Sequence, residues 1–321
     1  MIDISLLGSG GGIPLANRFL SSLIINYKGR KILLDCGEGT QVAMRKAHSG
    51  FKTIDIICIS HIHGDHIFGL PGLLATIANS DRKEDITIIG PKGINKTIKA
   101  IKTLVSYLPF DLNTIEISKG DLTFVISDKT LVLKKGEDKY NDLKKDLEIS
   151  TIELDHSSPC IGYSFYIPRK PKFDQKKALS NNVPRDHWAS LQMGEVLLYE
   201  DKLYEPYMVL GEVRRGIKLT YITDTRPIGT IVEFIDGSDL FICEGTYGDN
   251  DDLDKAIANK HMTFSEAAIL AKEGDVKKLL LTHFSSAMDK PHMYEMNAKD
   301  IFADTIIGYD GFFMSLSFDR E

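Results

Sequence analysis

One short segment limits what this chain can fold into more than any other: a cluster of metal-binding side chains directly after an apolar run. The run Ile56-Ile57-Cys58-Ile59 predicts a buried strand. Three histidines and one aspartate follow it closely, at His61, His63, Asp65 and His66. Buried imidazoles and carboxylates each need a hydrogen-bond partner or a metal ion. The pattern therefore predicts a metal site at the end of a strand.

The spacing within this cluster suits two adjacent metal ions. Extended backbone places His61 and His63 on the same side of the chain. Gly64 permits a sharp turn that carries Asp65 and His66 to a second position. Imidazole together with carboxylate fits zinc best, with manganese or iron as alternatives.

Four side chains cannot complete the coordination of two ions, so further ligands should lie downstream. His156, Asp224 and His283 each stand at the end of a strand-like run, in the same strand-then-loop setting as the first cluster. Asp224 is a candidate carboxylate to bridge the two ions. Three other histidines, at positions 48, 187 and 292, are left out because their surroundings suggest no such role.

Apolar runs alternate with helical patterns in both halves of the 321-residue chain, which favours the α/β class. In the first half, strands are expected over 2–7, 20–26, 31–34, 54–59 and 86–89, and helices over 39–47, 69–78 and 94–107. Further strands are expected within 122–161, around a charged turn at 134–145, and then over 218–222, 240–243 and 278–281. Thr263-Phe-Ser-Glu266 has the pattern of a capping box that opens a helix. Helices can cover only the outer faces of two sheets, so the pattern suggests an αββα sandwich with its loops gathered at one edge.

Residues 166–215 differ in character, with several prolines and many charges, and are expected to project from the body as an insertion. The net charge of −6 excludes a globally basic nucleic-acid binder but permits a local basic patch. Such a patch is found in the window 165–180, where Asp174 is the one acid among five cations: Arg169, Lys170, Lys172, Lys176 and Lys177. A solvated, charged loop is the alternative interpretation of this window.

Other features bear on the compartment. No apolar run approaches the ~18 residues of a membrane span, so no membrane association is expected. The start of the chain has an acid where a secretory signal carries basic residues, so no targeting segment is predicted. Four cysteines without a C-x-x-C pair argue against a disulfide framework and favour the reducing cytoplasm.

The segment 61–66 matches the H-x-H-x-D-H signature of the metallo-β-lactamase superfamily, and the chain resembles the ribonuclease Z family within it. The narrower matches are Leu34-Asp-Cys-Gly-Glu-Gly-Thr-Gln41, Phe68-Gly-Leu-Pro-Gly-Leu-Leu74, Gly90-Pro-Lys-Gly93, Thr223-Asp-Thr-Arg226 and Leu281-Thr-His-Phe-Ser285. The resemblance implies one metallo-β-lactamase-fold domain over residues 1–321, an αββα sandwich of two mixed sheets with helices outside. It also implies that an arm inserted at about 166–210 binds tRNA.

The resemblance implies a zinc-dependent endoribonuclease that removes the 3′ trailer of precursor tRNA and acts as a homodimer. It implies two zinc ions per chain, or manganese or another divalent ion in their place. His61, His63 and His156 would hold one ion and Asp65, His66 and His283 the other, with Asp224 as the bridge.

Two further residues are carried over from the family's motifs. Glu244 lies in Cys243-Glu-Gly-Thr246, which is similar to the family's His-Glu-Ala-Thr, and His261 lies in a segment similar to its His-Ser-Thr. Phosphodiester hydrolysis needs a nucleophile and a proton for the leaving 3′ oxygen. Asp65 is expected to orient the attacking water or take its proton. His261 is expected to protonate the leaving group or brace the phosphate, with Glu244 holding its tautomer.

The loop after the first strand departs from the family pattern. Where the family frequently has Pro-x-Lys-x-Arg-Asn, this chain keeps only Pro14 and Arg18, which are candidate contacts to the RNA 3′ end. The glycine run 8–12 lacks the G-x-G-x-x-G spacing of a dinucleotide loop. It could cradle phosphate, or it could be a tight turn that brings backbone close to the metal site.

Two alternatives remain open from the sequence. A small-molecule metallohydrolase acting on an ester, lactone or thioester would share the metal site but have no use for a basic arm. A non-catalytic, metal-stabilised RNA-binding protein would share the arm, although the full set of seven ligand residues argues against a degenerate site.

Overall fold

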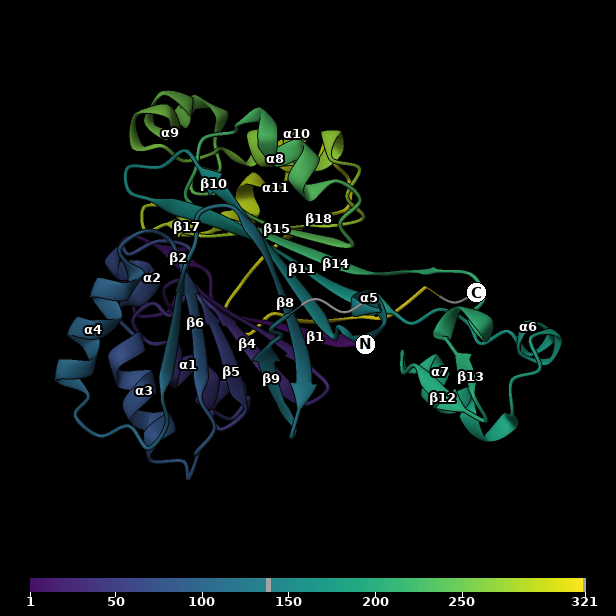
Figure 1. Ribbon diagram of the computed structural model, residues 1–321. Coiled ribbons are helices and arrows are strands. Elements are labelled where there is room, and N and C mark those ends of the chain that lie inside the picture. Colours follow the sequence, from purple (N-terminus) through teal and green to yellow (C-terminus); the bar gives the residue numbers. More distant parts are fainter. Residues whose placement is uncertain (137–139, 320–321) are drawn as a thin grey trace.

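The structure is a computed structural model that describes residues 1–136 and 140–319. Two large sheets pack face to face and helices cover their outer faces (Figure 1), so the predicted αββα sandwich is confirmed. Among the described residues, none of the helices combines the length and the apolar character needed to cross a membrane.

The first sheet has seven strands, and helices connect its successive strands from β4 to β7. In spatial order the strands are β19 (Phe313–Leu316), β1 (Ile2–Gly8), β3 (Ser22–Tyr27), β4 (Arg30–Leu34), β5 (Ile54–Cys58), β6 (Ile86–Gly90) and β7 (Leu112–Glu116). The helices that pack on its outer face are α1 (Thr40–Lys46), α3 (Leu70–Ala78) and α4 (Ile94–Leu104). Strands β4 to β7 run parallel, so their carboxyl ends lie at one edge of the sheet.

The second sheet has eight strands and its own helical layer. In spatial order the strands are β18 (Thr305–Ile307), β16 (Leu279–Thr282), β15 (Leu240–Glu244), β14 (Arg214–Ile222), β11 (Cys160–Arg169), β10 (Leu147–Leu154), β8 (Gly120–Ser127) and β9 (Thr130–Leu133). The helices on this side are α8 (Gly229–Ile235), α9 (Leu253–Asn259), α10 (Phe264–Glu273) and α11 (Glu295–Lys299). The predicted capping box is present, because Thr263 and Glu266 cap α10 reciprocally.

The alternation of side chains along a strand explains the layers. In β5, Ile56 and Cys58 belong to the core between the sheets, whereas Ile57 between them belongs to the core beneath the helices. Both faces are buried, which explains why the segment 56–59 is a continuous apolar run rather than an alternating one. Tyr163, on β11 of the other sheet, donates its hydroxyl to the Ile59 carbonyl at 2.7 Å and fixes the end of this strand.

The chain turns sharply at several strand ends on the same edge. Three polar residues there adopt left-handed φ values: Asp35 at 53°, Asp224 at 44° and His283 at 57°. Asp35 and His283 directly follow β4 and β16, and Asp224 is the second residue after β14. Such backbone conformations are uncommon for residues other than glycine and concentrate at functional sites. Here each turn directs a polar side chain into the space between the loops.

Two short elements close this edge. Strand β2 (Gly10–Gly11) pairs in parallel with β17 (Phe284–Ser285), which brings the first glycine loop beside the loop that carries His283. Helix α2 (Gly64–Ile67) carries Asp65 and His66 of the first histidine cluster. Loops from both halves of the chain therefore meet at one place.

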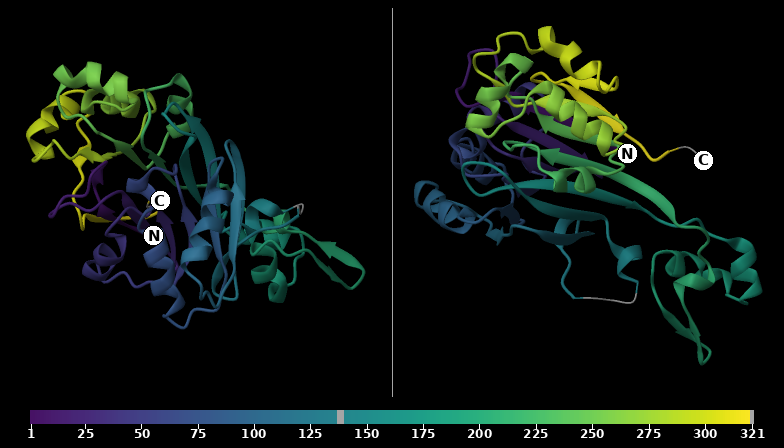
Figure 2. Two further views of the ribbon diagram at one scale, coloured as in Figure 1. Left: turned by 90° about the vertical axis from the view of Figure 1, so that its left-hand side faces the viewer. Right: turned by 90° about the horizontal axis from the view of Figure 1, so that it is seen from above.

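Strands β11 and β14 extend beyond the body and carry a projecting arm, residues 170–213 (Figures 1 and 2). The arm contains α6 (Gln175–Ser180), α7 (Trp188–Gln192), β12 (Leu197–Tyr199) and β13 (Lys202–Tyr204). It has a small apolar core of its own, built around Ala178, Val183, Leu191 and Val209. The sequence predicted a projecting, charged insertion but not its internal fold, which forms because these side chains bury one another.

Other elements were not predicted from the sequence. Helices α8, α9 and α11 are short, and β19 returns from the carboxyl-terminal region to pair with β1. The predicted charged turn at 134–145 includes 137–139, which lie outside the described residues, and it contains the short helix α5 (Asn141–Lys144). The remaining short helices are 3-10 turns: Arg185–His187, Pro206–Met208, Asn250–Asp252 and Pro291–Tyr294.

Candidate metal centre

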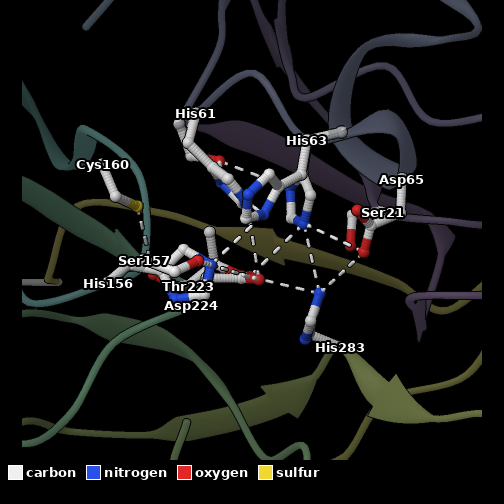
Figure 3. A network of polar contacts seen from close by, with 12 residues as sticks. Ser21, His61, His63, Asp65, His156, Ser157, Cys160, Thr223, Asp224 and His283 are labelled. Carbon is white, nitrogen blue, oxygen red and sulfur yellow. Dashed lines mark hydrogen bonds and ion pairs between the residues drawn. The ribbon is translucent and has the colours of Figure 1, made fainter. Parts of the chain in front are cut away.

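The seven predicted ligand residues converge at the edge where the strand ends meet, and Figure 3 labels all of them except His66. They form two groups whose nitrogen and oxygen atoms lie within 4.8 Å of one another. The groups are His61, His63, His156 and Asp224, and Asp65, His66, Asp224 and His283. Residues separated by more than 200 positions in the sequence thus face a common space.

The first group gathers three imidazoles around one oxygen of Asp224. His63 Nδ1 lies 3.0 Å from His61 Nε2 and 3.3 Å from His156 Nε2. Asp224 Oδ2 lies 3.6 Å from His61 Nε2 and 3.8 Å from His156 Nε2. On the far side of its ring, His156 Nδ1 lies 3.3 Å from the Lys260 carbonyl. A proton on Nδ1 would leave Nε2 available to bind a metal.

The second group lies around the other oxygen of Asp224. The Nε2 atoms of His66 and His283 are 3.1 Å apart and lie 3.3 and 3.2 Å from Asp224 Oδ1. Asp65 Oδ2 completes the group at 3.5 Å from His66 Nε2 and 3.4 Å from His283 Nε2. Asp224 therefore offers one oxygen to each group, as a bridging carboxylate must.

The donor set fits a pair of divalent metal ions. Ring nitrogens face each other at 3.0 Å in one group and 3.1 Å in the other, where their lone pairs repel unless a proton or a cation lies between them. Imidazole nitrogen and carboxylate oxygen are donors that zinc accepts. Within the described residues the cysteines are all buried and free, and none belongs to either group.

The electrostatics of the cluster also favour a cation. Burial alone would raise the pKa of Asp224, but His283, His66 and His61 hold that pKa well below its usual value. Burial, together with the neighbouring His66, lowers the pKa of His61 well below its usual value. An ionised carboxylate and a neutral imidazole are the forms that bind metal.

Asp35 is a site residue that the sequence did not single out, although it lies in one of the quoted motifs. Its buried carboxylate lies 2.8 Å from His66 Nδ1 and accepts hydrogen bonds from the Tyr221 hydroxyl at 2.8 Å and from Ser60. Through His66 and Ser60, which also contacts His61 at 3.1 Å, it orients ligands of both ions. A carboxylate directly after a predicted strand was the one signal that could have indicated this role.

Replacing Asp35 by asparagine should weaken metal binding by about 10- to 100-fold, the usual cost of losing a partner that orients a ligand. The amide would present hydrogens to groups that are themselves donors. Chelator competition measures the change, and Tyr221→Phe, which removes one of the donors and keeps the carboxylate, should have a smaller effect. Unchanged affinity in Asp35→Asn would contradict the orienting role.

His261 and Glu244 lie beside the metal ligands. Both Glu244 carboxylate oxygens lie 3.2 Å from His261 Nδ1, and Thr246 Oγ1 lies between this pair and His283 Nδ1. His261 Nε2 is 4.0 Å from Asp224 Oδ2, so its free nitrogen faces the centre. Burial lowers the pKa of His261, but Glu244 and Asp224 outweigh burial and raise it to about 9.

The glycine loop lies directly against the centre. A side chain at Gly11 would overlap the His283 ring, since an added Cβ would lie 2.4 Å from it. The Gly12 amide donates to Asp65 Oδ2 at 2.6 Å. The run therefore brings backbone close to the metal ligands, one of the two roles considered from the sequence, while phosphate binding by the loop stays a prediction.

The structure places the predicted RNA contacts in different settings. Pro14 is exposed on the loop after the glycine run. Arg18 is buried, and its guanidinium donates to the carbonyls of Met288 at 2.8 Å and Asp289 at 3.0 Å. It thus holds the loop after His283 in place, and a contact from Arg18 to RNA stays a prediction.

The five cations of the basic window lie at the base of the arm and on α6. Arg169 lies over the Phe318 ring and donates to the Asp319 carbonyl at 3.0 Å. Lys170 contacts the Met193 sulfur at 3.0 Å, and Lys177 donates to the Leu210 carbonyl at 2.9 Å. Lys172 and Lys176 are exposed. All five lie on or next to the segment that projects from the body (Figure 2).

Comparison with known proteins gives close relatives over the whole chain. A protein named ribonuclease Z from Alkaliphilus oremlandii is 59% identical over 312 residues, which cover 97% of this chain and 98% of that protein. The ribonuclease Z of Clostridium beijerinckii is 56% identical and covers 100% of both chains. A family model described as "Anti-Pycsar protein Apyc1" matches residues 2–173, a range that ends before Asp224, Glu244, His261 and His283.

Solved structures give the same fold. The short form of human tRNase Z has 25% sequence identity and a TM-score of 0.66, over 98% of this chain and 99% of that one. A long form of ribonuclease Z from yeast, at 20% identity, has a TM-score of 0.65 over 98% of this chain and 41% of its own. The second likeness concerns the fold alone.

Proposed function

The chain belongs to the ribonuclease Z family and is a tRNA 3′-processing endoribonuclease, and we propose that it uses two zinc ions to cut precursor tRNA. In this proposal it hydrolyses one phosphodiester bond, which leaves a 3′-hydroxyl on the tRNA and a 5′-phosphate on the trailer. One observation supports the two-metal chemistry most directly: Asp224 offers one oxygen to each of two adjacent groups of ligands. In hydrolytic enzymes with two metal ions, such a site stabilises both the attacking oxygen and the leaving oxygen at the phosphate.

The residues of the site divide the work of hydrolysis. Two divalent ions, when bound, would supply Lewis acidity at the phosphate and lower the pKa of a water molecule to about 7. Asp65, which accepts a hydrogen bond from the Gly12 amide, would orient that water or take its proton. Partners on the far side of the ring hold four of the five histidines: Ser60 for His61, the Lys260 carbonyl for His156, Asp35 for His66 and Thr246 for His283.

Protonation of the leaving 3′ oxygen falls to His261 in this mechanism. Glu244 contacts Nδ1 of the ring, so the opposite nitrogen points toward the centre. Glu244 is itself fixed, because it accepts from the Thr225 amide at 2.7 Å and the Met262 amide at 3.1 Å. A buried, fully bonded carboxylate can hold the imidazole in one orientation without entering the reaction.

A comparison of substrates tests the function. The metal-loaded protein should cleave a precursor tRNA and should be far less active on small esters, lactones and thioesters. Activity confined to small molecules would favour the alternative metallohydrolase, and binding of tRNA without cleavage would favour the non-catalytic RNA-binding protein. Neither alternative is favoured by the full-length relatives, which are named ribonuclease Z.

We propose that the arm binds precursor tRNA away from the cut. Its supporting strands pair at Arg169 and Arg214, so residues 170–213 can be replaced by an Asn-Gly turn that joins two paired positions. This deletion should weaken tRNA binding and make its dependence on salt shallower, because fewer counterions are released. Hydrolysis of a small phosphodiester should persist. Loss of both activities would show that the arm belongs to the fold or the active site instead.

Assembly and compartment are further parts of the proposal. We propose a homodimer, as the family resemblance implies, and light scattering of the purified chain would measure its mass.

We also propose that the protein acts in the cytoplasm. In its support, Cys36, Cys58, Cys160 and Cys243 are all buried and unpaired, as expected in a reducing compartment.

A further inference from the structure

We infer that Arg226 is a positioning residue for His261: it anchors the backbone of His261 to the start of α10 and so keeps the imidazole directed at the metal centre. This inference rests on the proposed function, because it assigns Arg226 a part in the cleavage of RNA. Arg226 belongs to the quoted motif Thr223-Asp-Thr-Arg226, but neither the metal groups nor the proton transfer described above uses it.

The guanidinium of Arg226 joins two parts of the chain. It donates to the carbonyl oxygen of His261 and makes a paired contact with both carboxylate oxygens of Glu266, one of them at 3.0 Å. Both side chains of this ion pair are 18% exposed, so solvent only partly screens it. A planar guanidinium can make these contacts together, whereas a lysine ammonium lacks the fork geometry.

Each peptide around His261 has a partner. The His261 amide donates to the Ala256 carbonyl at 2.8 Å, and the Met262 amide donates to Glu244 at 3.1 Å. The Thr263 amide donates to Glu266 at 2.9 Å, as part of the capping box. Arg226 provides the contact to the one carbonyl that belongs to His261 itself. Loss of the Arg226 side chain would therefore release the His261 carbonyl and let the imidazole move, while the capping box would still hold the start of α10.

The position of Arg226 in the chain strengthens this assignment. It lies two residues after Asp224, which offers oxygens to both groups of metal ligands. Thr225, between them, donates its amide to Glu244 at 2.7 Å, and the Arg226 amide donates to the Asp155 carbonyl at 3.1 Å, next to His156. One tripeptide thus fixes the bridging carboxylate, the partner of His261 and the backbone of His261.

Replacing Arg226 by glutamine should lower the single-turnover rate of precursor tRNA cleavage by about 10²-fold, the usual result of small misplacement of a reacting group. Metal content, tRNA affinity and the temperature of unfolding should stay close to wild type. Arg226→Lys keeps the charge beside Glu266, so its cleavage rate should lie between those of the wild type and Arg226→Gln. The matched control is Arg215→Gln, since Arg215 also contacts one carboxylate, Asp239 at 2.7 Å, and a backbone carbonyl, far from the site.

A second substrate separates positioning from a general structural defect. A small phosphodiester with a nitrophenolate leaving group needs no proton on departure, so Arg226→Gln should hydrolyse it at nearly the wild-type rate. The double variant with His261→Ala should cleave tRNA no more slowly than His261→Ala alone, because the two residues act as one unit. Equal slowing on both substrates, or additive losses in the double variant, would overturn the inference.

The outcomes also distinguish this inference from the function on which it rests. A wild-type protein that fails to cleave precursor tRNA would overturn the function. A wild-type protein that cleaves, together with an Arg226→Gln variant of unchanged rate, would overturn the inference alone. If Arg226→Gln does not fold, Arg226→Lys decides: a slower tRNA cleavage with normal metal content supports the inference, and an unchanged rate overturns it.

Discussion

Asp224→Ala is expected to abolish most of the activity and to release metal. The carboxylate faces both groups of ligands, at 3.2 Å from His283 Nε2 and 3.6 Å from His61 Nε2, so its loss removes a ligand from each ion at once. Ions of this kind contribute several kcal/mol to the transition state. At 1.36 kcal/mol per factor of ten, cleavage should fall by at least about 10³-fold. Elemental analysis should show fewer metal ions per chain than in the wild type.

Two controls separate metal loss from backbone strain. Asp224 has a φ of 44°, a conformation in which alanine is strained, and the exposed Asp275 has the same φ. Asp275→Ala therefore reproduces the backbone change without touching the site, and should keep full metal content. Asparagine tolerates this conformation well, so Asp224→Asn should fold normally yet still lose metal. A fully loaded and active Asp224→Asn would contradict the bridging assignment.

His261→Ala is expected to keep both metals and normal tRNA affinity but to slow cleavage by a factor on the order of 10²–10⁴, the usual range for a lost acid or base. The residue contributes no atom to the two ligand groups that share Asp224, yet its Nε2 lies 4.0 Å from that carboxylate. Single-turnover cleavage with saturating enzyme separates the chemical step from binding. The exposed His292→Ala is the matched control and should behave as wild type.

Glu244→Gln should give a milder loss of the same kind, because Glu244 only orients the ring. The double variant with His261→Ala should be hardly slower than His261→Ala alone. An unaffected rate in His261→Ala would remove the residue from the mechanism and leave the metal ligands and Asp65 to act without it.

Much of the fold could be predicted from local patterns. The apolar run at β5 indicated a buried strand, and the Thr263–Glu266 pattern indicated the start of α10, because both signals depend on neighbours in the sequence. The pairing of β19 with β1 joins the two ends of the chain and leaves no such local signal. The folded core of the arm was missed for a related reason: its apolar residues are dispersed among charges and meet only in three dimensions.

The candidate site shows the same division. The metal ligands were predictable because histidines and aspartates at strand ends meet wherever those ends share an edge. Asp35 and Thr246 were not, since their roles depend on which side chains they meet across the sheets. Arg18 shows that charge alone does not reveal the partner, because its guanidinium donates to backbone carbonyls in a buried setting.

The central claim is that the bridged metal centre hydrolyses the 3′ trailer from precursor tRNA. The most direct test is to incubate the full chain with a precursor tRNA labelled at each end in turn, before and after chelation and restoration of zinc, and to map the products. The account predicts one metal-dependent cut, with a 3′-hydroxyl on the tRNA and a 5′-phosphate on the trailer. A cut that leaves a phosphate on the tRNA, or cleavage that survives complete metal removal, would contradict it.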